Sequence, residues 1–170
     1  MSHPPRLKNF SYTGQYRHFL TFCSEHRAPI LIKEPVFRLF CAQLRTCCDA
    51  HGMAADAYCV MPDHVHLLTR AASATAKLQS FMKNLKQQTG WGFRKDFGGR
   101  LWQRDYYDHV LREDDEDAAV IAYIVNNPLR AGLVKSPLDY PFWGSLTWTR
   151  EQILDFIGGI REWKPSRGRP

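Results

Sequence analysis

The sequence predicts an α+β domain built on an antiparallel sheet. Tyr16–Cys23 is rich in aromatic residues and threonine, which favours a first strand. Glu34–His51 has apolar residues at helical spacing and is followed by a glycine, a typical helix stop. Met53–Val60 and His64–Arg70 then have the composition of two strands joined by a Pro-Asp turn. We therefore expect these two strands to be antiparallel neighbours.

The same alternation of elements continues along the chain. From Ser73 an apolar stripe at helical spacing predicts a second helix, which we expect to end at Gly90 and Gly92. Tyr106–Arg112 alternates apolar and polar residues, as a further strand would.

Five consecutive acidic residues at 113–117 indicate the start of a third helix, because carboxylates cap free amides and meet the positive end of the helix dipole. This helix should run from Ala118 to Asn126 or Asn127 and stop at Pro128, which cannot continue it. Residues 150–163 predict a short final helix.

Length and composition indicate one globular domain. The chain has 170 residues, of which 44% are hydrophobic and 24% charged. We expect a flexible N-terminal arm at 1–15, the domain at 16–148, and a C-terminal helix with a basic tail at 149–170. A membrane helix needs about 20 apolar residues and a signal peptide needs an apolar core, and neither pattern is present. We therefore expect a cytoplasmic protein that does not enter a membrane.

His64 and His66 are the most distinctive pair of residues. They are one residue apart in an apolar run, so on a strand both side chains point to the same face while Val65 and Leu67 point into the core. Two neutral imidazoles arranged in this way form half of a divalent metal site and need further oxygen or nitrogen ligands. Taken alone, such a pair is also compatible with ordinary surface histidines.

A basic and aromatic stretch follows the histidines. The net charge of +6 already favours a polyanionic partner. Between Lys77 and Arg112, eight cations face three acids, and aromatic residues are interleaved with them, namely Trp91, Phe93, Phe97, Trp102, Tyr106 and Tyr107. Cations that hold phosphates and rings that stack on bases would form a surface for single-stranded or hairpin DNA, although each ring could instead pack inward. The candidate residues here are Lys77, Lys83, Lys86, Arg94, Lys95, Arg100, Trp102 and Arg104.

Tyr123 and Asn127 are four residues apart near the end of the third predicted helix, so they share one face. A tyrosine on a helix is most often structural, and an asparagine before a proline is most often a helix cap. Composition and spacing therefore leave the roles of both residues open.

Four segments in this order resemble a known family. They are MPDHVHLL at 61–68, a basic helix, WQRDYYDH at 102–109 and YIVNNPLRAGLV at 123–134. Together they resemble the REP-associated tyrosine transposases, which belong to the HUH single-tyrosine superfamily of transposases and relaxases. The resemblance covers roughly residues 15–145. It implies a ferredoxin-like fold whose antiparallel sheet displays the two histidines, with the tyrosine on a nearby helix.

The resemblance also implies a role for each matching residue. Tyr123 takes the place of the nucleophile, His64 and His66 of the metal ligands, and Asn127 of the third ligand, which is a glutamine in related insertion-sequence transposases. The implied ion is Mg²⁺ or Mn²⁺. The implied partner is single-stranded or hairpin DNA of the repetitive extragenic palindrome (REP) type, bound by a monomer or a homodimer. Arg130 would join the DNA-binding set.

The activity implied is cleavage and rejoining of single-stranded DNA through a 5′-phosphotyrosine intermediate. A phenolate with a free pKa of ~10 is a good leaving group, so a DNA 3′-OH can reverse the covalent step. A nearby cation, Lys86 or Arg130, would help to ionise the phenol. Two other functions fit the same residues: a hairpin-binding protein without catalysis, and a hydrolase that holds zinc on His64, His66 and His109.

Overall fold

The computed structural model describes residues 16–111 and 117–158. Its centre is an antiparallel five-stranded sheet with the strand order β4-β1-β3-β2-β5. The strands are β1 (Arg17–Cys23), β2 (Met53–Val60), β3 (His64–Ala71), β4 (Tyr107–Val110) and β5 (Trp143–Gly144). The predicted hairpin of β2 and β3 is present, and β3 occupies the middle of the sheet.

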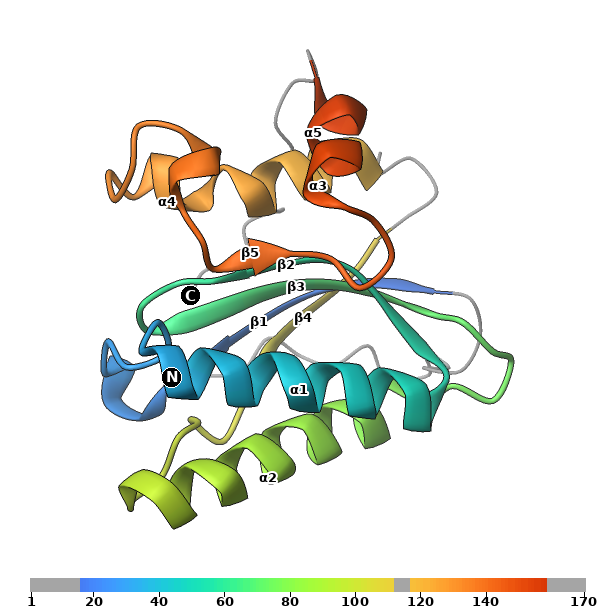
Figure 1. The fold of residues 1–170 in the computed structure, drawn as a ribbon. Coiled ribbons are helices and arrows are strands. Elements are labelled where there is room, and N and C mark those ends of the chain that lie inside the picture. Colours follow the sequence, from blue (N-terminus) through green and yellow to red (C-terminus); the bar gives the residue numbers. More distant parts are fainter. Residues whose placement is uncertain (1–15, 112–116, 159–170) are drawn as a thin grey trace.

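Helices cover both faces of this sheet. Figure 1 shows α1 and α2 on one side and α3, α4 and α5 on the other. Their bounds are α1 (Glu34–His51), α2 (Leu78–Phe97), α3 (Asp117–Val125), α4 (Asn127–Arg130) and α5 (Arg150–Ile157), with short 3₁₀ turns at Glu25–Arg27 and Pro137–Asp139. The order β1-α1-β2-β3-α2-β4 gives the expected ferredoxin-like α+β fold, to which α3, α4, β5 and α5 are added.

The alternation of side chains along the strands divides the core into two layers. Leu20, Phe22, Val65 and Leu67 pack against the helices α1 and α2. Residues of opposite parity, among them Phe19 and Leu68, pack against α3 and α5. The prediction that Val65 and Leu67 point into the core is therefore confirmed, and the two histidines face the layer that contains α3.

The predicted end of the second helix at Gly90 and Gly92 is wrong, because α2 continues to Phe97. Neither glycine is a stop signal, and Gly92 is a packing position. A Cβ atom on Gly92 would lie 2.9 Å from a methyl group of Leu39, so glycine at this position allows α1 and α2 to approach closely. The helix ends where Gly98 adopts a positive φ of 72°.

The chain around Pro128 also differs from the prediction. Helix α3 ends at Val125, and Pro128 lies within the single turn of α4 that begins at Asn127. Proline is compatible with the first turn of a helix because its missing N–H has no partner there. The structure thus shows a break between two helices where the sequence predicts one stop.

Some predicted segments fall outside the part of the chain that the structure describes. The arm at 1–15, the acidic residues at 113–116 and the basic tail from 164 onward lie outside the described residues. Asp117 is described, begins α3 and pairs with Arg17 of β1. The final helix begins at Arg150 as predicted, but the prediction that it continues to 163 is wrong, because α5 ends at Ile157 and Gly158 is in a turn. Within the described ranges, every helix is too short or too polar to cross a lipid bilayer.

Candidate active site

His64 and His66 converge on the α3 side of strand β3. Their Nε2 atoms are 3.2 Å apart, and their rings are nearly perpendicular. The strand alone brings them together, because side chains two residues apart on a strand share a face.

Two neighbouring side chains fix the orientation of these rings. Asp63 Oδ1 lies 2.6 Å from His64 Nδ1, and Thr21 Oγ1 lies 2.9 Å from His66 Nδ1. Thr21 is opposite His66 in the β1–β3 register, and a salt bridge of 3.0 Å to Arg27 holds Asp63. When each Nδ1 carries the ring proton, both Nε2 atoms keep a lone pair, and the 3.2 Å between them lets one ion contact both. This is the arrangement that metal-binding histidines require.

His66 is kept neutral by its surroundings. It is 6% exposed, and burial together with the neighbouring His64 lowers its pKa to about 3, while a hydrogen bond to the Asn127 side chain opposes the shift. A neutral imidazole retains the lone pair that a metal ion needs.

Tyr123 lies beside the histidine pair. Its ring centroid is 5.9 Å from that of His66 and 5.7 Å from that of Phe19, with both pairs in edge-on geometry. Tyr123 is partly buried, whereas its neighbours Ala122 and Ile124 are fully packed in the core. The helix α3 therefore presents this tyrosine to the histidine face of the sheet.

Asn127 and Arg130 surround Tyr123 on the same side. The Asn127 side chain donates a hydrogen bond of 2.9 Å to the carbonyl oxygen of Tyr123 and also bonds His66. The Arg130 guanidinium lies 4.6 Å from the centroid of the Tyr123 ring. The other cation considered for ionising the phenol, Lys86, projects from α2 on the opposite side of the sheet.

His109 lies on the same face as the histidine pair but does not join it. Its register partner is Phe19 of β1, and its ring stacks parallel on Tyr107 at 6.4 Å. Among the described residues, no three His, Cys, Asp or Glu side chains are grouped as a metal site would need. The structure therefore does not support a zinc site made of three histidines.

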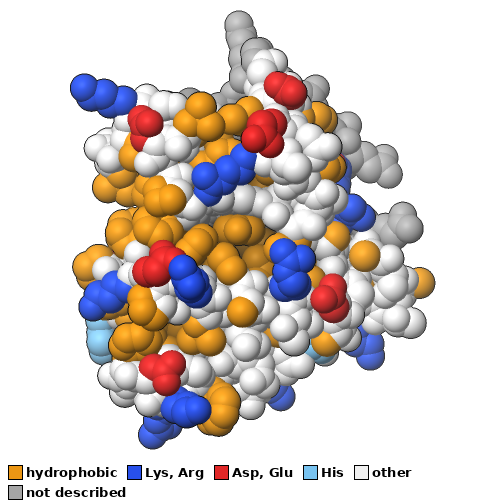
Figure 2. Space-filling model, in the orientation of Figure 1, with side chains coloured by type: hydrophobic (Ala, Val, Ile, Leu, Met, Phe, Trp, Pro, Cys, Tyr) orange, Lys and Arg blue, Asp and Glu red, His pale blue; other side chains and the backbone are white. Residues whose placement is uncertain are grey.

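The basic residues predicted to bind DNA lie mainly on and beside α2. Lys77, Lys83, Arg94, Lys95, Arg100 and Arg104 are exposed. On the face shown in Figure 2, Lys and Arg side chains are scattered among acidic ones, and hydrophobic side chains gather in a band between α1 and the layer of α4 and α5.

Trp102 does not fit the prediction of a base-stacking residue. It is 4% exposed, packs edge-on against Phe22 at 5.0 Å and donates a hydrogen bond of 2.7 Å to Thr89. Its ring is a core element that joins β1 to α2. The exposed tryptophan of this region is Trp91, with 67% of its surface accessible.

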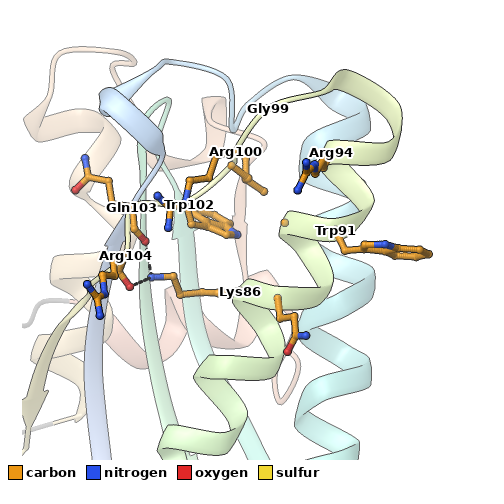
Figure 3. Close-up of a pocket in the computed structure, with 11 residues that line it drawn as sticks. Lys86, Trp91, Arg94, Gly99, Arg100, Trp102, Gln103 and Arg104 are labelled. Carbon is orange, nitrogen blue, oxygen red and sulfur yellow. Dashed lines mark hydrogen bonds between the residues drawn. The ribbon is translucent and has the colours of Figure 1, made fainter.

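Lys86 connects α2 to the segment before β4 through hydrogen bonds. Its ammonium group donates hydrogen bonds to the carbonyl oxygens of Gln103 (2.7 Å), Arg104 (2.9 Å) and Asp105 (3.2 Å). Figure 3 shows the Lys86 side chain reaching from α2 to this segment. Burial lowers the pKa of Lys86 to about 8, from 10.5 for an ordinary lysine.

Lys86 should therefore make stability depend on pH. Between pH 8 and pH 10 the unfolded chain binds more protons at this lysine than the folded protein, so the free energy of unfolding attributable to Lys86 rises with pH. We expect the wild-type value minus that of Lys86→Met to increase by about 1 to 2 kcal/mol over this interval, allowing for partial exposure. Urea denaturation at each pH measures it, and a constant difference would contradict the assignment.

Sequence reasoning missed the residues that orient the histidines. Thr21 is 45 positions from His66, and only the β1–β3 register brings the two together. The sequence marks Asp63 as a turn residue, and its place directly before a histidine is a signal that it can also orient that ring. Phe19, which packs on both His66 and Tyr123, carries no sequence signal beyond its apolar character.

The structure thus places two histidines of a ferredoxin-like sheet beside a tyrosine on a helix. The sequence pattern described as "Transposase IS200 like" matches residues 11–127. The chain therefore belongs to the IS200-like transposase family, and the transposase resemblance found in the sequence is confirmed.

Within this family the chain is similar to REP-associated tyrosine transposases. A Haemophilus influenzae protein classed with them is 27% identical over 146 residues, covering 79% of this chain and 81% of that protein. The REP-associated tyrosine transposase of Escherichia coli K12 is 27% identical over 88 residues, about half of each chain. A REP-associated tyrosine transposase solved with a REP hairpin shares the fold, with a TM-score of 0.69, 20% identity and coverage of 84% and 82% of the two chains.

Proposed function

We propose that the protein is a metal-dependent endonuclease and strand transferase for single-stranded DNA, acting on hairpin DNA of the REP type through a 5′-phosphotyrosine intermediate. The observation that supports it best is the meeting of the Tyr123 ring with His66, whose Nε2 lies 3.2 Å from that of His64. The membership in a transposase family agrees with this chemistry.

The residues present fit a divalent ion. Two nitrogens that each lie about 2.1 Å from one ion are about 3.0 to 3.4 Å apart at octahedral or tetrahedral angles, and the observed separation of 3.2 Å lies within that range. His64, His66 and Asn127 would hold Mg²⁺ or Mn²⁺, with Asn127 supplying its amide oxygen. The bound ion would supply charge neutralisation at the scissile phosphate, which otherwise repels a nucleophile.

Tyr123 would perform the covalent step. Its phenolic oxygen forms a bond to phosphorus while the bond from phosphorus to the 3′ oxygen breaks, giving a phosphotyrosine on the 5′ side and a free 3′-OH. The phenol gives up its proton to solvent and the departing 3′ oxygen takes one up, while the Arg130 guanidinium, 4.6 Å from the centre of the ring, would stabilise negative charge on the attacking oxygen. Attack of a DNA 3′-OH on the same phosphorus releases Tyr123 and rejoins a strand.

Hairpin DNA is the partner that the comparison favours. The structural relative was solved with a REP hairpin, and this chain shares its fold. The exposed cations on and beside α2 would contact phosphates, so binding should weaken steeply as the salt concentration rises.

The decisive experiment is a search for the covalent conjugate. REP-type hairpin oligonucleotides labelled at the 3′ end, which stays with the fragment attached to Tyr123, are incubated with the protein and Mn²⁺, and the products are separated on a denaturing gel. A labelled band that migrates with the protein and disappears after protease treatment is expected. Tight hairpin binding with neither cleavage nor conjugate, across a panel of hairpins and flanks, would instead support the non-catalytic DNA-binding function.

Asp63→Asn tests whether the histidine pair binds a divalent ion, and it leaves the three proposed ligands unchanged. The carboxylate holds His64 Nδ1 at 2.6 Å, and loss of such a partner commonly lowers metal affinity about 10- to 100-fold. Calorimetric titration with Mn²⁺ measures the effect. Asp108→Asn is the matched control, because Asp108 pairs with His18 at 3.0 Å on the other side of the sheet. Equal affinities in both variants would count against His64 as a ligand.

A further inference from the structure

A groove runs along α2 on the side of the sheet away from the histidines. Its largest part has a volume of about 730 Å³ and lies between α2 and the segment 99–104. A second hollow of about 310 Å³ continues it toward the start of α2 and shares Lys86 and Arg104 with the first. We call the two together the α2 groove.

The walls of the α2 groove are rich in cations. Arg94, Arg100 and Arg104 line it and are exposed, and Lys83 lines its second part. Arg100 is 3.7 Å from Glu25, too far and too exposed for that carboxylate to neutralise it fully. The lining side chains therefore favour an anionic occupant, and a series of cations along a groove suits a chain of phosphates.

Trp91 adds an aromatic surface at the rim. It borders the α2 groove and is 67% exposed, and in Figure 3 its ring projects from α2 on the side away from Lys86 and Gln103, so it forms the outer edge of the groove. Large aromatic rings are seldom left so accessible, and an exposed ring next to phosphate-binding cations is a stacking surface for a nucleic acid base.

The length of the α2 groove fits a short tract of nucleotides. Its lining residues on α2 extend from Gln79 to Arg94, which is about 22 Å along the helix axis at about 1.5 Å per residue. At about 3.4 Å per stacked nucleotide this corresponds to about six nucleotides.

The α2 groove opens at the same end of the sheet as the histidine pair. Cys23 of β1 is opposite His64 in the β1–β3 register. At the other edge of β1, the Cys23 carbonyl oxygen accepts a hydrogen bond of 3.0 Å from the backbone N–H of Gln103. Two strand spacings, about 10 Å, therefore separate the backbones of His64 and Gln103. A DNA strand that leaves the active site can therefore pass the end of β1 and enter the α2 groove.

We propose that the α2 groove binds an unpaired stretch of the DNA strand that is cut at Tyr123, with arginines on its phosphates and Trp91 stacked on a base. This inference rests on the proposed function for the identity of the strand. It assigns the α2 face to unpaired DNA rather than to duplex, because base stacking on Trp91 requires an open base.

The test uses the full-length protein and a probe that does not depend on the target sequence. A fluorescein-labelled oligo(dT) of about 12 nucleotides is titrated in EDTA, so that no metal takes part, and anisotropy gives the affinity. Trp91→Ala should weaken binding at least about fivefold. Arg94→Ala combined with Arg100→Ala should weaken it about tenfold or more and reduce the salt slope by about 1.4, at about 0.7 per phosphate contact.

Arg38→Ala is the matched control. The Arg38 side chain is 77% exposed and pairs with Glu34 on α1, outside the α2 groove. We expect its affinity to stay within about twofold of wild type. Groove variants that behave like Arg38→Ala, or a duplex of equal length that binds more tightly than oligo(dT), would overturn the proposal.

The two proposals fail in different ways. A covalent conjugate in the denaturing gel together with unchanged oligo(dT) binding by the groove variants would refute the α2 groove and leave strand transfer intact. Weakened oligo(dT) binding by those variants without any conjugate would support the groove and refute strand transfer.

Discussion

Tyr123→Phe should form no detectable DNA conjugate and should cut no DNA, while its affinity for hairpin DNA stays within about twofold of wild type. The substitution removes only the phenolic oxygen that would attack phosphorus and keeps the ring that packs on Phe19 and His66. Denaturing gels measure the conjugate, and anisotropy measures the binding. Continued cleavage by this variant would rule out Tyr123 as the nucleophile.

Tyr107→Phe is the matched control for this prediction. Tyr107 lies on the same face of the sheet, also packs edge-on against Phe19, at 6.4 Å, and is partly buried. Burial raises the pKa of its phenol, which disfavours the ionised form that a nucleophile needs. We expect Tyr107→Phe to retain the conjugate. Loss of the conjugate in this variant alone would indicate that Tyr107 of β4, and not Tyr123, is the nucleophile.

His64→Ala should abolish the metal-dependent reaction. It removes one of the two Nε2 atoms and leaves a single imidazole, so we expect Mn²⁺ affinity to fall at least about 100-fold and conjugate formation to become undetectable. Thermal shift with and without Mn²⁺ measures the binding independently of catalysis. A variant that still binds and uses Mn²⁺ as well as wild type would exclude the histidine pair as ligands.

His109→Ala separates this expectation from that of a three-histidine hydrolase. The ring of His109 stacks on Tyr107 instead of meeting the pair, so its removal should leave Mn²⁺ stabilisation unchanged. A loss of metal binding as large as that of His64→Ala would favour the hydrolase.

Local patterns in the sequence predicted the framework well. The bounds of α1 and β2 and the β2–β3 hairpin follow from apolar periodicity and from a Pro-Asp turn, which act over a few residues. The same reasoning failed at Gly92, because a glycine that ends a helix and one that admits a neighbouring helix look alike until Leu39 is placed beside it. The order of strands in the sheet depends on long-range pairing that periodicity does not contain.

Local sequence patterns predicted only part of the candidate site. The period of two along β3 was sufficient to pair the histidines, whereas Tyr123 and Asn127 acquired roles only through the family resemblance. Of the interleaved aromatics, Trp102 proved to be core and Trp91 surface. Nothing within a short window distinguishes the two, because burial is decided by where α2 and β1 meet.

The histidines and the tyrosine are anchored in different layers of the molecule. β3 is hydrogen-bonded on both sides as the central strand, whereas α3 rests on the sheet through apolar contacts of Val120, Ile121 and Ile124. Apart from the ion pair of Asp117 with Arg17 at its start, α3 is held by nondirectional contacts, so its end near Tyr123 can shift by a fraction of an ångström at a smaller energetic cost than a central strand can. Small shifts of α3 would thus change the position of Tyr123, and of Asn127 that is hydrogen-bonded to it, while the two histidines stay in place, so natural variation in reaction rate should accumulate among the apolar residues beneath that helix.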